Sequence, residues 1–198
     1  MSVKQTRKII MITDGDRVAC KAVQQVAHDV GGRCISASAG NPTPLNGEQL
    51  VKQILQAVND PVLVMFDDNG QGGYGMGEQA IRYVAQHPQI EVLGAIAVAS
   101  NTEAVSGTHF DLAIDATGHL VQSAVDKDGH VEGVEGMSPA LNQRIYGDTV
   151  DVLDQLDIPL IIGVGDIGKM EGHDHIRYGC PVTKKAVELI LQRSGFNG

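Results

Sequence analysis

The stretch "IIMITDGDRVACKAVQQVAHDVGG", residues 9–32, contains one complete unit of the fold. Ile9–Thr13 is a nearly continuous apolar run, which predicts a buried strand. After Asp16 the apolar residues recur at helical spacing, and Gly31 with Gly32 predicts the end of that helix. A buried strand followed directly by a helix is the repeating unit of a parallel sheet covered by helices.

The same alternation continues along the chain. Further strands are predicted at residues 34–39, 62–66, 92–100, 112–114 and 159–165, and further helices at 48–58, 76–85, 139–156 and 181–192. Residues 119–133 depart from the alternation and predict a β-hairpin that turns at Asp128–Gly129. We therefore expect an α/β fold: a doubly wound, mainly parallel sheet with helices on both faces and a β-hairpin insertion, in a single domain over residues 1–198.

Composition limits the classes of function. The chain has 198 residues, 42% of them apolar, which is ordinary for a soluble globular protein, and a formal net charge of −9. This charge argues against nucleic acid as a partner and against direct attachment to an anionic membrane. The three cysteines include no C-x-x-C pair, so we expect reduced thiols. We also expect no signal peptide, because the N-terminus lacks the apolar segment of one.

Acidic residues follow several of the predicted strands. Because the carboxyl ends of parallel strands meet at one edge of the sheet, these acids are expected to lie together. A hard cation would relieve their mutual repulsion. The predicted metal ligands are Asp14, Asp16, Asp67, Asp68 and Asp166. Helix capping is the alternative interpretation, because aspartate is a common N-cap where a strand leads into a helix.

Two enzyme families share part of this pattern. Residues 14–18, "DGDRV", resemble the start of haloacid-dehalogenase-like phosphatases, in which Asp14 would be the nucleophile and Asp16 the general acid. In that template the remaining parts would be Asp166 as a magnesium ligand, Ser100 as the hydroxyl residue, and Lys169 or Lys184 as the lysine. The toprim domain also places acids at two strand ends, but the glutamate expected after its first strand is missing here.

Longer blocks carry a more specific resemblance. They are "ITDGD" (12–16), "GGRCISASAGNPTPLNGEQLV" (31–51), "VMFDDNGQGGYGMGEQA" (64–80), "VASNTE" (98–103) and "GVGDIGKMEGHDHIRYGCPVTKKAVELILQRSG" (163–195). Together they resemble the stage V sporulation protein AE family, in its soluble AEa type.

This resemblance implies a function in endospore-forming bacteria. The stage V A-type proteins move dipicolinic acid with calcium into the spore and release it during germination. The AEa type would be a non-enzymatic accessory, peripheral at the inner spore membrane of the spore or forespore. Its partners would be the membrane-embedded and soluble stage V A-type proteins, so its membrane association would be indirect. The resemblance supplies no catalytic residue and leaves the cofactor unknown. The alternative is a magnesium-dependent phosphatase or phosphoryl-transfer enzyme.

Overall fold

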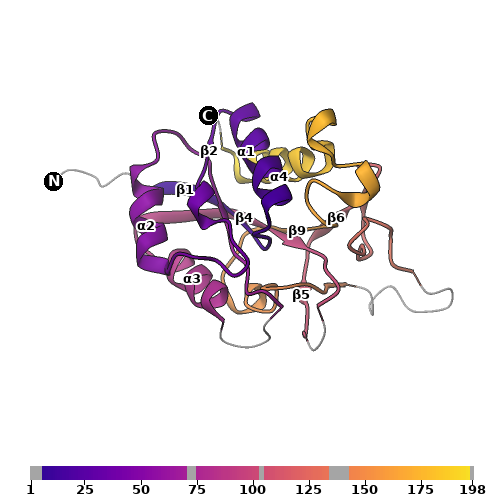
Figure 1. Ribbon diagram of the computed structural model, residues 1–198, viewed down its shortest axis with the longest axis horizontal. Coiled ribbons are helices and arrows are strands. Elements are labelled where there is room, and N and C mark those ends of the chain that lie inside the picture. The colour runs from indigo at the N-terminus through magenta and orange to yellow at the C-terminus, as the bar shows by residue number, and fades with distance from the viewer. Residues whose placement is uncertain (1–5, 71–74, 103–104, 134–142, 197–198) are drawn as a thin grey trace.

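The computed structural model describes residues 6–70, 75–102, 105–133 and 143–196, and these residues contain a seven-stranded sheet (Figure 1). The strand order is β2-β3-β1-β4-β9-β6-β7, and every neighbouring pair is parallel except β6 and β7. The strands are β1 (Arg7–Ile12), β2 (Arg33–Cys34), β3 (Val62–Met65), β4 (Ile90–Val98), β6 (Leu112–Ile114), β7 (Leu120–Val121) and β9 (Ile161–Val164).

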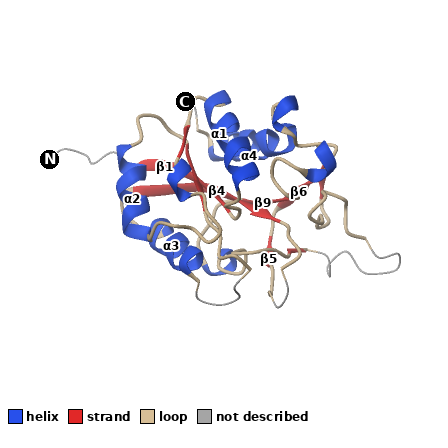
Figure 2. Cartoon of the chain, viewed as in Figure 1, coloured by secondary structure: helices blue, strands red, loops and turns tan. Residues whose placement is uncertain are grey.

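Helices cover both faces of this sheet (Figure 2). One face carries α1 and α4, and the other carries α2 and α3. The helices are α1 (Arg17–Asp29), α2 (Gly47–Gln56), α3 (Met76–Ala85) and α4 (Pro181–Ser194). A separate antiparallel pair, β5 (Thr108–His109) with β8 (Arg144–Ile145), lies beside the sheet. The predicted α/β fold class is confirmed, whereas the single domain over residues 1–198 stays a prediction.

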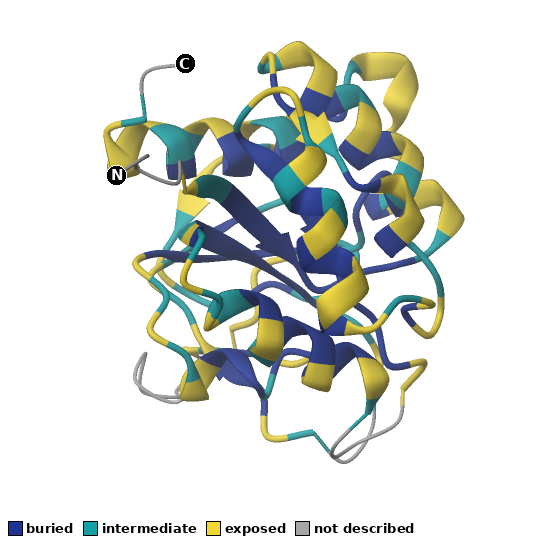
Figure 3. Cartoon of the chain, turned by 90° about the vertical axis from the view of Figure 1, so that its left-hand side faces the viewer, coloured by how far each residue is buried: buried dark blue, intermediate teal, exposed yellow. Residues whose placement is uncertain are grey.

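The central strand β1 shows why the fold needs two helical layers. Ile9 and Met11 pack in the core on the side of α2 and α3, whereas Ile10 and Ile12 pack on the side of α1 and α4. All four side chains are fully buried, and Figure 3 shows the strands as a buried layer between the helices. An apolar run of this kind has no face that could be left in water, so both faces must be covered.

The strand predicted at residues 34–39 is largely wrong. Only its first residue, Cys34, belongs to β2, and Ser36–Ser38 forms a short 3-10 helix. The hydroxyl of Ser38 explains the difference, because it donates to the carbonyl of Ile35 at 2.6 Å and accepts the N–H of Met65 at 2.9 Å. A side chain thus takes the place of backbone pairing at the edge of the sheet.

The helix predicted at residues 139–156 is also wrong over the part that the structure describes. Its first residues lie outside the described residues. Residues 143–156 instead form β8, turns and a 3-10 helix, Leu153–Gln155. Aspartates of this segment bind backbone N–H groups elsewhere: Asp151 accepts from Gly107 at 2.7 Å, and Asp154 accepts from His109 at 2.9 Å. These long-range bonds compete with helix formation.

The predicted turn at Asp128–Gly129 is present. An antiparallel bridge joins Val125 to Val131 across it, and Gly129 has a φ of +80°, which glycine adopts without strain. The turn also contacts the sheet edge, because the carbonyl of Lys127 accepts the N–H of Asp166 at 2.7 Å. The insertion therefore forms one wall near the carboxyl end of β9.

A fully buried carboxylate, Asp174, fixes the loop between β9 and α4. Its Oδ1 accepts the N–H groups of Val182 and Thr183 at 2.8 and 3.0 Å. Both groups belong to the first turn of α4, where N–H groups have no partner within the helix. Its Oδ2 accepts the Gly168 N–H at 2.8 Å and the Thr183 hydroxyl at 2.5 Å. Asp174 thus caps α4 although it lies outside the helix, which begins at Pro181. It also joins Gly168, near the start of the loop, to Val182, at the start of the helix.

We expect Asp174→Ala to destabilise the protein strongly, because several buried donors lose their acceptor at about 1–3 kcal/mol each. A total loss of about 3–5 kcal/mol would lower Tm by roughly 10 °C in a chain of this size. Urea and thermal unfolding would measure it, with the exposed Asp157→Ala as the matched control. A loss no larger than that of the control would show that the Asp174 network does not stabilise the fold.

Candidate functional site

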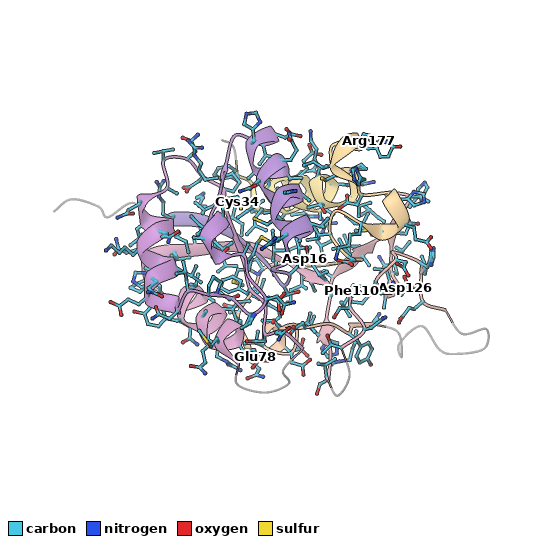
Figure 4. All side chains as sticks on the ribbon, viewed as in Figure 1. Asp16, Cys34, Glu78, Phe110, Asp126 and Arg177 are labelled. Carbon is cyan, nitrogen blue, oxygen red and sulfur yellow. The ribbon has the colours of Figure 1, made fainter. Side chains whose placement is uncertain are left out.

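A cleft of about 370 Å³ lies where the parallel strands end. Segments that follow β1, β3, β4 and β9 form it, as expected for a doubly wound sheet. The polar residues that line it include Thr13, Asp14, Asp16, Asn41, Asp67, Asn69, Ser100, Asn101, Thr102, Lys127, Asp148, Asp166 and Lys169. Asp16, labelled in Figure 4, marks the start of α1 at this edge. Four of the five predicted metal ligands therefore line one cleft.

Asp14 is one of two nearly buried acids that line the cleft, and Asp67 is the other. Asp14 is 8% exposed, and its Oδ1 accepts the N–H of Asp16 at 3.1 Å. Its Oδ2 is buried and has no hydrogen-bond partner among the described residues. Burial raises the pKa of Asp14 to about 7, and the charges of Asp16 and Asp166 act in the same direction. A buried acceptor without a donor is costly, so this oxygen is suited to a ligand or a proton.

Lys169 links two other acids of the cleft. Its Nζ lies 2.5 Å from Asp16 Oδ2 and 3.0 Å from Asp166 Oδ2. The other oxygen of Asp16 caps α1 by accepting the N–H groups of Val18 and Ala19 at 2.7 and 2.8 Å. Burial acts to raise the pKa of Asp16, but Lys169 and these N–H groups lower it overall. Asp16 is therefore an ionised acid with both oxygens occupied.

The adjacent aspartates after β3 have different functions. Asp68 accepts the N–H groups of Gly77 and Glu78 at 2.6 and 2.9 Å, so it caps α3 from outside the helix. The hydroxyl of Thr149 donates to it at 3.3 Å. The residue before the helix must be glycine, because a Cβ on Gly75 would lie 2.1 Å from Asp68 Oδ1. The helix-cap interpretation therefore describes Asp68, which does not line the cleft.

Asp67 lies beside the cleft and beside a second carboxylate. Its Oδ1 accepts the N–H of Asn69 at 2.7 Å. Burial raises the pKa of Asp67 to about 7, and the neighbouring Asp148, within hydrogen-bonding reach, raises it further. The loop that carries Asp14 packs directly against Asp67, because a Cβ on Gly15 would lie 2.7 Å from the Cβ of Asp67. The loop after β1 and the loop after β3, both of which carry aspartates, are therefore in contact at Gly15.

Sequence reasoning missed Asp148, because it placed this residue inside the wrong helix. In the structure Asp148 accepts the N–H of Gly70, and its own N–H donates to the Ser100 hydroxyl at 3.1 Å. The adjacent pair Gly147-Asp148 is a turn signal that could have argued against a helix there. Asp148 joins the ends of β3 and β4 across the cleft.

A family model described as stage V sporulation protein AE1 matches residues 8–194. The chain belongs to this family. The resemblance drawn from the sequence blocks is therefore confirmed, and with it a function in sporulation. No curated protein and no solved structure matches the chain.

The family description names a stage of sporulation and does not name a reaction. Within the described part of this AE1 family chain, no helix has the length and apolar character needed to cross a bilayer. A sporulation family of this kind indicates involvement in the forespore.

The metal site over Asp14, Asp16, Asp67, Asp68 and Asp166 stays a prediction. Among the described residues, no three side chains of His, Cys, Asp or Glu are grouped closely enough to hold a metal by themselves. Of the two lysines considered for a phosphatase, Lys169 lines the cleft, whereas Lys184 pairs with Asp29 at 3.2 Å. Ser100 also lines the cleft.

Three acids at or next to the cleft make stability depend on pH. Asp14, Asp67 and Glu78 have pKa values raised to about 7, and burial is the largest cause for each. In the unfolded chain such acids ionise at about pH 4. Folding therefore takes up protons between about pH 4 and pH 7. The free energy of unfolding falls as pH rises through this window, because the folded state binds more protons.

We expect Asp14→Asn to reduce this pH dependence, because it removes one of the acids. In buffer with EDTA at about pH 8, the Tm of the variant should exceed that of the parent. Each kcal/mol of unfolding free energy gained should raise Tm by roughly 2–4 °C. Near about pH 5 the two proteins should have similar stability. Asp157→Asn, at an exposed site, is the control. A steeper fall of Tm with pH in Asp14→Asn would contradict the raised pKa of Asp14.

Proposed function

We propose that this AE1 family protein is an accessory of the stage V A-type system that moves calcium and dipicolinic acid in spore formation and germination. The observation that carries the proposal is the family match over residues 8–194, nearly the whole chain. A chain matched over this length is expected to share the family's place in the system as well as its fold.

We further propose that a protein partner holds the chain at the inner spore membrane. The net charge of −9 opposes adsorption to anionic lipid, and the described helices include none that could span a bilayer. Peripheral attachment by lipid contact alone would need a basic or strongly apolar face. Membrane-embedded and soluble stage V A-type proteins are the expected partners.

Purified protein should therefore float poorly with anionic liposomes, with or without millimolar calcium, because its charge repels that surface. In spore lysates we expect it to sediment with the inner membrane and to leave that fraction when the channel subunits are deleted. An inner-membrane marker protein, unaffected by the deletion, is the control. If purified protein bound liposomes to the same extent as it sediments with spore membranes, attachment through a protein partner would be contradicted.

Phosphoryl transfer is the second candidate, and one observation favours it: Asp14, Ser100 and Lys169 line the same cleft. The pKa of Asp16 opposes it. A general acid needs a raised pKa, whereas Lys169 and the N–H groups of α1 hold the pKa of Asp16 below its usual value. The oxygens of Asp16 are also occupied by the helix and the lysine. The proton donor required by the phosphatase template is therefore missing.

Assays with p-nitrophenyl phosphate and magnesium would separate the two candidates. We expect the parent protein and Asp14→Asn to give the same background rate, because Lys169 and the start of α1 lower the pKa of Asp16, which disfavours it as a general acid. Magnesium-dependent turnover that Asp14→Asn abolishes and Asp157→Asn retains would establish the enzyme.

A further inference from the structure

The acids of the cleft fall into two groups according to how their charge is balanced. Asp16 and Asp166 share Lys169, and Asp68 is bound to the start of α3. Asp14, Asp67 and Asp148 form no ion pair with a described lysine, arginine or histidine. No described cation is therefore paired with any acid of this second group.

Neither lysine of the cleft's described lining forms an ion pair with an acid of the second group. Lys169 already contacts two carboxylates, and Lys127 lies 2.8 Å from Asp128 Oδ2, at the tip of the hairpin. In contrast, several neutral side chains that accept or donate hydrogen bonds line the same cleft: Asn41, Ser100, Asn101 and Thr102. Such groups can hold the water molecules of a hydrated cation.

The unpartnered Oδ2 of Asp14 gives this cluster a specific feature that a merely acidic surface lacks. It belongs to a side chain that is more than nine-tenths buried and that lines the cleft, and no described donor satisfies it. Asp67 lies on the adjoining loop, packed against Gly15, and Asp148 lies next to Asp67. The three carboxyl groups come from three separate segments, so the fold rather than local sequence brings them together.

We propose that the cleft binds one Mg²⁺ ion, with Asp14 Oδ2 and a carboxylate oxygen of the Asp67–Asp148 pair as protein ligands and water as the remaining ligands. This assignment keeps Asp14 and Asp67 of the five predicted metal ligands and replaces Asp16, Asp68 and Asp166 by Asp148, which the sequence did not indicate. It goes beyond the accessory function proposed above and does not depend on any partner.

The number of carboxylates favours Mg²⁺ over Ca²⁺. Magnesium keeps several of its waters and needs one or two protein carboxylates, whereas calcium takes six to eight oxygens and is held by larger ligand sets. A cleft of about 370 Å³ also has room for the retained waters.

The test uses Mn²⁺ as a paramagnetic substitute for Mg²⁺. The purified full chain, freed of metal with EDTA and dialysed, is titrated with MnCl₂ while the signal of free Mn²⁺ is followed by electron paramagnetic resonance. We expect saturable binding of one ion per chain and displacement by MgCl₂. Asp14→Asn and Asp148→Asn should each weaken binding by about tenfold or more, as loss of a ligand or its close support does.

Asp157→Asn, an exposed acid outside the cleft, is the matched control and should bind as the parent does. Circular dichroism of each variant separates loss of the site from loss of the fold. Absence of saturable binding, or unchanged binding in both cleft variants, would overturn the site. Displacement of Mn²⁺ by CaCl₂ at lower concentration than by MgCl₂ would overturn the assignment to magnesium. Failure of membrane docking in spores would leave this measurement unaffected, so the two proposals can fail separately.

Discussion

Repulsion among carboxylates at the carboxyl edge of the sheet is the constraint around which the loops of this protein are arranged. A doubly wound parallel sheet brings the ends of its strands together, and here those ends carry aspartates. Each carboxylate needs a compensating group. The start of a helix supplies it for Asp16, Asp68 and Asp174, because unpaired N–H groups there favour an anion.

Lys169 compensates a further part of the negative charge and connects two loops. By contacting Asp16 and Asp166 it ties the start of α1 to the segment after β9. This segment is held from the other side by the buried Asp174, which also caps α4. The same contacts that neutralise acids therefore fix the walls of the cleft. Asp14 and the Asp67–Asp148 pair, which no described cation neutralises by an ion pair, also line this cleft.

Membership of the stage V sporulation protein AE1 family gives this cleft a biological setting in spore formation. In the accessory function that we propose, the protein would work beside transported calcium, which is a divalent cation. A small, hydrated cation site would respond to that environment without requiring catalysis. The lowered pKa of Asp16 and the occupied oxygens of that residue do not match the proton donor of the phosphatase template.

The sequence by itself determined the layers of the fold and most of the cleft. Continuous apolar runs must be buried on both faces, so residues such as Ile9 and Ile10 already required helices on two sides. It follows from the same pattern that acids after those runs share one edge. The tertiary structure alone decided how each acid is used. Asp67 and Asp68 are neighbours in sequence, yet one lines the cleft and the other caps α3. Asp148 joins them only because bonds from residues 148–154 to distant N–H groups replace the helix that local periodicity predicts. Local patterns encode burial and periodicity, whereas the partner of a polar side chain depends on which distant segments the fold brings beside it.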